Sequence, residues 1–473
     1  MAPFFLGHGV EDDLLMACQK GQDQLIQFVE KRLLAGIDRM VSLRDTLPKN
    51  KPLTFSSLFR FEVELTPSTT TAKKVVQADR KFLQRLITAF QAGRDVHLEE
   101  ILKHELMPSP PALAQMNGNL RSGQKRSGQK SLLSDSLTGD TACPQSLEAA
   151  DIGEKGTLII DVQAHVVALG KPHKAQNFGD LADMFVTSVL QIGAAFSRID
   201  IIFDRYYDLS IKSSTRKKRG KGAVPVRREI QNRSVPLPQK WDSFITHAAN
   251  KADFARFLSQ QLLLKAPANK TIVVAKGFSD EEQVESSTPD VNTEELEGRH
   301  EEADMRIVLH CVKSRASSIV VAARDTDVLV LLLAHFANMP CQLIWMKAGT
   351  SKKPKYIPIH LVAAQFDAHV LSSLPAFHSL TGCDTTSFLA GHTKKSCWNV
   401  YNENHDLLSN LGKGDLNDRT SAAAEAFICK VYKVHATISV DSARSTLFAQ
   451  AHLLETLPPS HNALSFLSIS IRP

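Results

Sequence analysis

The chain has 473 residues, of which 43% are hydrophobic and 22% charged, and its net charge is +6 at pH 7. This composition is ordinary for a globular protein. Seven scattered cysteines without a CxxC pair argue against a disulfide framework and favour a reducing compartment. The longest apolar run, residues 328–334, is shorter than the ~18 residues of a membrane helix, and the first residues lack a secretory pattern. We therefore expect an intracellular protein with no membrane partner.

Residues 1–107 are expected to form a helical region, because apolar residues recur there at intervals of three and four. A partner-binding role is the default expectation for this region. Prolines at 108–111 and the polar repeat RSGQK-RSGQK at 121–130 follow it. They predict a flexible linker over residues 108–154.

From residue 155, short apolar segments alternate with segments of helical period. Strands are expected within GTLIID, RIDIIFD, NKTIVVAKG and SIVVAARD, with helices between them. This alternation predicts an α/β domain over 155–400, with a mostly parallel central sheet flanked by helices. Its strands are buried on both faces, which explains apolar runs without polar alternation. A helical C-terminal extension is expected over 401–473.

Acidic residues follow several of these strands. In open α/β sheets, ligands bind beyond the carboxyl ends of the strands. Carboxylates crowded there could not all ionise without cations, and hard oxygen ligands suit Mg²⁺ or Mn²⁺. Taken singly, an aspartate at a strand end is more often a helix cap or turn residue, so only the joint pattern indicates a metal site. The acids at this edge are Asp161, Asp204, Asp325 and Asp327, joined by Glu301, Glu302 and Asp304 from the start of a helix.

Five motifs in order resemble those of PIN-like domains of the flap-endonuclease and XPG type. They are LIIDVQAHV, the FDG-like IIFDRYYD, the EAE-like EAD, RDTDVL for the family's EDxDxL, and LTGCDTTS for its L-x-G-x-D-Y. The resemblance extends over 161–400 and implies a site that holds two divalent ions, Mg²⁺ or Mn²⁺. Its implied catalytic and metal-binding residues are Asp161, Asp204, Glu302, Asp304, Asp325, Asp327 and Asp384.

Longer stretches are similar to a group of largely uncharacterised, often multicopy animal proteins with a suspected association with mobile elements. These stretches are EEADMRIVLH, DTDVLVLLL, PAFHSLTGCDTTSFLAG and FICKVY. The similarity extends from about residue 75 onward. It indicates a fold more clearly than a physiological role.

A basic segment, RYYDLSIKSSTRKKRGKG, follows Asp204. Such residues neutralise phosphates, and its tyrosines can stack on unpaired bases, which favours DNA or RNA as the partner. In the family, a Lys and an Arg of a helical arch contact the scissile phosphate, and Lys212 and Arg216 lie at similar offsets. The stretch RKKRGK is alternatively a nuclear-import signal or a solvated loop, so both nucleus and cytoplasm stay open. The candidate nucleic-acid-binding residues are Lys212, Arg216, Lys217, Lys218, Arg219, Lys394 and Lys395.

The segment FLAGHTKKSCW departs from the family pattern. The family has a glycine-rich hairpin that approaches duplex backbone closely, whereas His392 and Thr393 here replace its second glycine. We expect a weaker grip on duplex. The spacing of His378, Cys383, His392 and Cys397 also suggests zinc, but zinc ligands normally pair more closely, so packing roles are favoured.

The sequence thus predicts a metal-dependent nuclease that hydrolyses phosphodiester bonds by a two-metal mechanism. The alternative is a non-catalytic nucleic-acid-binding or scaffold protein, a degenerate nuclease derived from a mobile element. If the acidic cluster holds no metal, removing Asp325 or Asp327 is expected to relieve repulsion and stabilise the fold.

Overall fold

The computed structural model divides the chain into two compact units, Met1–Leu98 and Glu99–Pro473. Most of the expected N-terminal helical region lies outside the described residues, and its last helix is α6 (Leu98–Leu102). None of the described helices is long and apolar enough to cross a membrane. The structure describes residues 97–104, 130–170, 175–204, 227–245, 247–278, 282–298, 303–350, 353–383, 388–450 and 456–469, with isolated positions 23, 26, 84, 88, 92, 93, 280 and 386.

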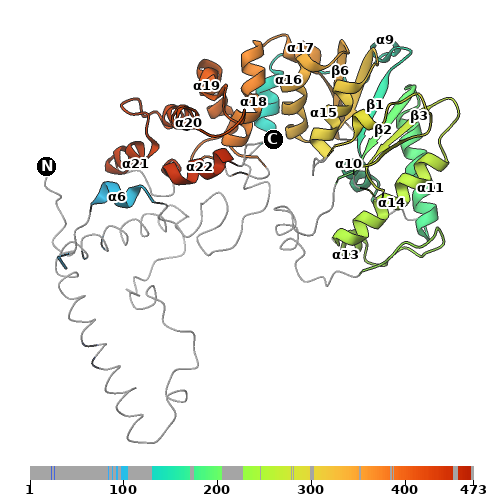
Figure 1. Cartoon of the computed structure of the whole chain (residues 1–473), viewed down its shortest axis with the longest axis horizontal. Coiled ribbons are helices and arrows are strands. Elements are labelled where there is room, and N and C mark those ends of the chain that lie inside the picture. The colour runs from blue at the N-terminus through green and yellow to red at the C-terminus, as the bar shows by residue number, and fades with distance from the viewer. Residues whose placement is uncertain are drawn as a thin grey trace, which may run out of the picture. The chain divides into compact units, whose positions relative to one another are not determined.

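The second unit is built on a seven-stranded sheet in the order β4-β3-β2-β1-β5-β6-β7 (Figure 1). Five neighbouring strands run parallel, and the two edge strands are antiparallel to their neighbours. The predicted α/β class with a mostly parallel sheet is therefore confirmed, as are the four predicted strands. The strands are β1 (Thr157–Asp161), β2 (Arg198–Ile202), β3 (Thr271–Ala275), β4 (Val284–Ser286), β5 (Ser318–Ala322), β6 (Leu343–Thr350) and β7 (Lys353–Pro358).

Helices cover both faces of this sheet. Successive strand residues point to opposite faces, so Leu158 and Ile160 pack on one side and Ile159 on the other. Helices α11 (Phe178–Ile192) and α14 (Ala248–Leu264) cover the first face. The second face carries α15 (Ala303–Lys313), α16 (Thr326–His335) and α18 (Ala368–Leu380).

Part of the expected linker is folded. Residues 105–129 lie outside the described residues, but Ser131–Thr138 form helix α8 and Ala149–Ile152 form α9. Leu133 and Leu137, one helical turn apart, are fully buried in the core of the second unit. This apolar pair supplies the face that holds α8 against the protein, so the second half of 108–154 differs from the flexible segment that its polar composition suggests.

The C-terminal part is helical, as expected, and packs beside α18 and α8 (Figure 1). Phe377 of α18 stacks on Tyr401 of α19 (Lys394–Asn404) with ring centroids 4.5 Å apart. Arg444 of α21 donates to the carbonyl oxygens of Leu102, His104 and Pro458. The remaining described helices are α10 (Val162–Leu169), α13 (Trp241–Ile245), α17 (Ile359–Ala363), α19 (Lys394–Asn404), α20 (Asp418–Val431), α21 (Val440–Ala449) and α22 (His461–Ile469), with short 3-10 turns at Glu294–Leu296, Phe336–Asn338 and His405–Leu408.

Candidate active site at the carboxyl edge of the sheet

The strand order creates a topological switch point between β1 and β5. From β1 the chain builds β2 and β3 on one side, and it later returns to place β5 and β6 on the other side. In such sheets the crevice beyond the carboxyl ends at the switch point is the usual ligand site. Asp161 ends β1, and Asp325 follows β5. Asp204 follows β2, the other neighbour of β1. The topology thus places these three aspartates at one edge.

Each of these aspartates also accepts a backbone hydrogen bond at the start of a helix. Asp161 Oδ1 accepts from the Gln163 amide at 2.9 Å, in the first turn of α10. Asp325 Oδ1 accepts from the Asp327 amide at 3.1 Å and is the N-cap of α16. Asp204 Oδ1 accepts from the amide of Ala303, the first residue of α15, at 3.2 Å. Such bonds satisfy helix N–H groups and place negative charge at the positive helix end.

The other predicted acids are placed less completely. Asp304 lies in the first turn of α15 and is half-buried. It follows Ala303, whose amide donates a hydrogen bond to Asp204. Glu302 and Asp384 lie outside the described residues, as does the basic segment with Lys212, Arg216, Lys217, Lys218 and Arg219. Within the described ranges, no three His, Cys, Asp or Glu side chains gather as a group that could hold a metal ion.

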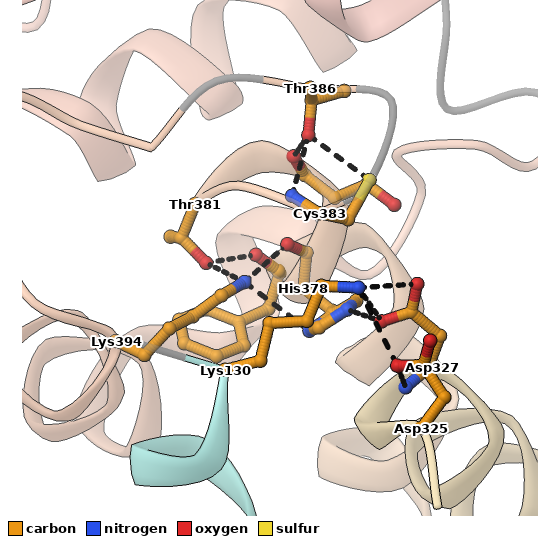
Figure 2. A network of polar contacts seen from close by, with 10 residues as sticks. Lys130, Asp325, Asp327, His378, Thr381, Cys383, Thr386 and Lys394 are labelled. Carbon is orange, nitrogen blue, oxygen red and sulfur yellow. Dashed lines mark hydrogen bonds and ion pairs between the residues drawn. The ribbon is translucent and has the colours of Figure 1, made fainter. Parts of the chain in front are cut away.

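Asp327 belongs to a polar network that also includes Asp325 (Figure 2). Lys130 Nζ lies 2.8 and 2.9 Å from its two carboxylate oxygens, and 3.5 Å from Asp325 Oδ1. His378 Nε2 lies 2.8 Å from Asp327 Oδ1. Burial alone would raise the pKa of Asp327, but the His378 hydrogen bond and the Lys130 charge outweigh it and hold that pKa well below its usual range. Asp327 is therefore ionised.

Lys394 extends the network on the far side of His378. Its Nζ contacts the carbonyl oxygen of His378, His378 Nδ1 at 3.2 Å and Thr381 Oγ1 at 2.8 Å. Thr381 gives its own hydroxyl hydrogen to the Phe377 carbonyl, so it accepts from Lys394. Three acceptors around one nitrogen require three hydrogens, which only the ammonium form carries.

The same contacts suit a neutral His378 with its hydrogen on Nε2. Its Nδ1 accepts from Lys394 and its Nε2 donates to Asp327, which describes a neutral imidazole. Burial, aided by the Lys394 charge, lowers the pKa of His378 to about 4. Burial also lowers the pKa of Lys394 to about 7, while its three acceptors favour the charged form.

These positions correct one sequence-based expectation, that Lys394 contacts a phosphate, and they show what two of the four candidate zinc ligands contact. Lys394 is 3% exposed and uses its three hydrogens inside the protein, so it does not present them to a phosphate as expected. Lys395, next to it, is exposed. Of the four candidate zinc ligands, His378 serves the Asp327 network and His392 packs on the Tyr432 ring, with centroids 4.4 Å apart.

Sequence reasoning missed three residues at this edge. Lys130 was assigned to the linker, and nothing local in the sequence connects it with Asp327. For His378 the sequence suggests a zinc ligand or, with more weight, a packing residue, but no partnership with Asp327. Arg324, between β5 and Asp325, is exposed at the switch point. It is the one of these three that the sequence could have indicated, because a cation stands directly before the Asp-Thr-Asp motif.

The carboxyl edge has the donor chemistry that Mg²⁺ or Mn²⁺ requires, because its acids offer only oxygen ligands. The Asp325–Asp327 pair already holds a cation, the Lys130 ammonium, which shows that this position attracts positive charge. Comparison of the sequence with protein-family models and with curated proteins finds no match in either case. The chemistry therefore has to be inferred from the residues of the chain itself.

Proposed function

We propose that this protein is a Mg²⁺- or Mn²⁺-dependent phosphodiesterase that hydrolyses DNA or RNA on a PIN-like fold. The observation that carries the proposal is the convergence of Asp161, Asp204 and Asp325 on the switch-point edge of a doubly wound sheet. A strand-end aspartate is common, but three at the same ligand-binding edge match the requirement of a phosphoryl-transfer site.

The acids that would hold metal are Asp161, Asp204, Asp304, Asp325 and Asp327, with Glu302 and Asp384 as the remaining members of the set. When bound, the metal polarises the phosphate and lowers the pKa of the attacking water. The chain's own contribution is preorganisation: the backbone bonds at Gln163, Ala303 and Asp327 hold one oxygen of each strand-end carboxylate in place.

Cationic side chains near this edge would position the nucleic-acid backbone. Arg324 is exposed directly beside Asp325, and Lys395 is exposed in the first turn of α19. A guanidinium can pair with a phosphate through two hydrogen bonds. We assign Arg324 to the scissile or adjacent phosphate and Lys395 to a more distant one.

The test uses the 473-residue protein, Mn²⁺ and a panel of single-stranded, flapped and duplex DNA and RNA. The decisive variant is Asp161→Asn, because Asn caps a helix about as well as Asp but lacks the charge. We expect cleavage to fall on the order of 100-fold or more with the fold intact. The control is Asp290→Asn, an exposed aspartate in the turn after β4, which should cleave like wild type. An Asp161→Asn protein as active as this control would refute the assignment.

A non-catalytic nucleic-acid-binding or scaffold role is the second candidate. Two observations favour it: Asp161, Asp204 and Asp325 all serve as helix-start acceptors, and Asp327 is neutralised by Lys130. On this alternative the protein binds nucleic acid, cleaves no member of the panel, and has the same melting temperature in Mn²⁺ and in EDTA. The two candidates therefore give opposite results in one set of measurements.

A further inference from the structure

The Asp325–Asp327 pair is held by a cation that belongs to the protein itself. Lys130 stands at the N-cap of α8, where its side chain makes no capping bond and reaches the carboxylates instead. Its side chain is 13% exposed, against 15% for Asp327 and 40% for Asp325. The ammonium is thus enclosed on the Asp327 side and open on the Asp325 side.

We propose that Lys130 is a resident cation that occupies the Asp325–Asp327 pair and must leave before a divalent ion can bind there. The proposal rests on the proposed function, since Asp325 belongs to the same acidic edge, and it adds a control on that site. Lys130 contacts both oxygens of Asp327, and one of Asp325. A metal ion would need the same oxygens, so the two cations exclude each other.

Charge balance supports this exclusion. The ammonium groups of Lys130 and Lys394 offset the carboxylates of Asp325 and Asp327, while His378 is neutral. Adding a divalent ion with Lys130 in place would bring like charges together in a partly buried region. Removing Lys130 takes one positive charge away from two neighbouring carboxylates, which favours binding of a divalent ion there.

Release of Lys130 requires little rearrangement. Leu133 and Leu137 anchor α8 in the core, whereas Lys130 precedes the helix. Four rotatable bonds let its ammonium swing away while the helix stays packed. The exposed side of Asp325 offers the route by which an ion from solvent would enter.

The decisive experiment measures Mn²⁺ binding by calorimetry and thermal unfolding in wild type, Lys130→Met and Lys155→Met. Lys155→Met removes the same charge from an exposed turn and serves as the matched control. We expect Lys130→Met to bind Mn²⁺ at least about tenfold more tightly than wild type, or to gain a site. Its melting temperature should rise by about 5 °C at Mn²⁺ near 100 times the Kd. The double variant K130M/D325N should lose this gain. Equal binding and equal thermal response in Lys130→Met and wild type would overturn the proposal.

A second measurement uses wild type and does not depend on the folding of a variant. Amine acetylation followed by mass spectrometry compares the labelling rates of Lys130 and Lys155 in EDTA and in MnCl₂ up to about 10 mM. This concentration exceeds the dissociation constants of weak protein sites for divalent ions. Labelling of Lys130 should accelerate with Mn²⁺ while that of Lys155 stays constant. If Lys130→Met does not fold, unchanged Lys130 labelling over the whole titration rejects the proposal.

The outcomes separate this inference from the proposed function. If Lys130→Met binds Mn²⁺ more tightly and the protein cleaves no nucleic acid, the resident-cation proposal is supported and the nuclease proposal is refuted. If cleavage depends on Asp161 and Lys130→Met leaves the Mn²⁺ affinity unchanged, the nuclease proposal is supported and the resident-cation proposal is refuted.

Discussion

Lys130 donates hydrogen bonds to both carboxylate oxygens of Asp327, at 2.8 and 2.9 Å, although 197 residues separate the two in the chain. This contact joins the start of α8 to the first turn of α16. It also turns an expected repulsion into an attraction. From sequence, two neighbouring carboxylates without metal should destabilise each other; in the structure a shared ammonium compensates them.

Asp327→Asn should therefore destabilise the metal-free protein. The substitution leaves the Lys130 ammonium without its main counter-charge in a partly buried position. We expect the free energy of unfolding in EDTA to fall by about 2–3 kcal/mol, less than the ~3–5 kcal/mol of a fully buried pair because the side chain is 15% exposed. Urea denaturation measures it, and exposed Asp290→Asn should stay within about 0.5 kcal/mol of wild type. A stabilised Asp327→Asn would restore the repulsion hypothesis.

His378 makes stability depend on pH. Burial, with the Lys394 charge, lowers its pKa to about 4, whereas the unfolded chain has the ordinary value near 6.5. Between these values the unfolded chain binds a proton that the folded chain does not. The free energy of unfolding must then fall as pH drops from about 6.5 to 4, by up to about 3 kcal/mol from this residue.

The check is a comparison with His378→Gln, which keeps an N–H donor for Asp327 and cannot titrate. Urea unfolding of both proteins in EDTA at pH 7, 5.5 and 4.5 gives the difference in slope, since carboxylates away from His378 titrate equally in both and Asp327 keeps its Lys130 partner. We expect wild type to lose more stability than the variant over this range. Parallel pH profiles would mean that His378 is not neutral in the folded state.

Asp200 offers a test of burial as the factor that decides the strength of an ion pair. Fully buried in β2, it accepts from Arg198 at 2.6 and 2.7 Å and contacts His310 Nδ1 at 2.7 Å. Asp183 also holds two cations, Arg233 and Lys265, but its side chain is 44% exposed.

Asp200→Asn should lower the free energy of unfolding by about 3–5 kcal/mol, because it leaves the Arg198 charge without a partner beside the core. The matched Asp183→Asn should cost less than about 1 kcal/mol, since water screens an exposed pair. Denaturant midpoints of the two variants provide the comparison. Similar losses in both would show that burial does not govern these pairs.

Arg324→Gln tests the contact proposed with the nucleic-acid backbone. Neutralising a phosphate releases counterions, so loss of one such contact should weaken binding across sequences and reduce the slope of log Kd against log salt by about 1. Fluorescence anisotropy with single-stranded and duplex probes at several salt concentrations gives this slope. Lys155→Gln removes an exposed charge before the amino end of β1, at the opposite edge of the sheet, and should leave the slope unchanged. An unaltered slope in Arg324→Gln would exclude this residue from the interface.

The sequence by itself determined the central strands and the edge at which the acids stand. β1, β3 and β5 carry runs of Ile, Val and Leu without polar alternation, a pattern typical of strands buried on both faces. β2 ends in a similar apolar run, Ile201 to Phe203, although Arg198 and Asp200 precede it. β7 could not be found this way. It begins Lys-Pro-Lys and contains two prolines. Proline has no backbone N–H to donate to a neighbouring strand, so it is tolerated at the edge of a sheet, where β7 lies.

Only the tertiary structure decided which partner each charge has. The local sequence pattern predicts where a charged side chain lies along a strand or helix. Its ionic partners, however, come from elements distant in the chain. Lys394 looks like an exposed phosphate contact in sequence, yet α18 presents His378 and Thr381 to it and encloses its ammonium. Asp327 looks like a metal ligand, yet packing of α8 through Leu133 and Leu137 delivers Lys130 to it across 197 residues. The physical reason is that burial and long-range packing, which no local motif encodes, set the electrostatic energy of a charge.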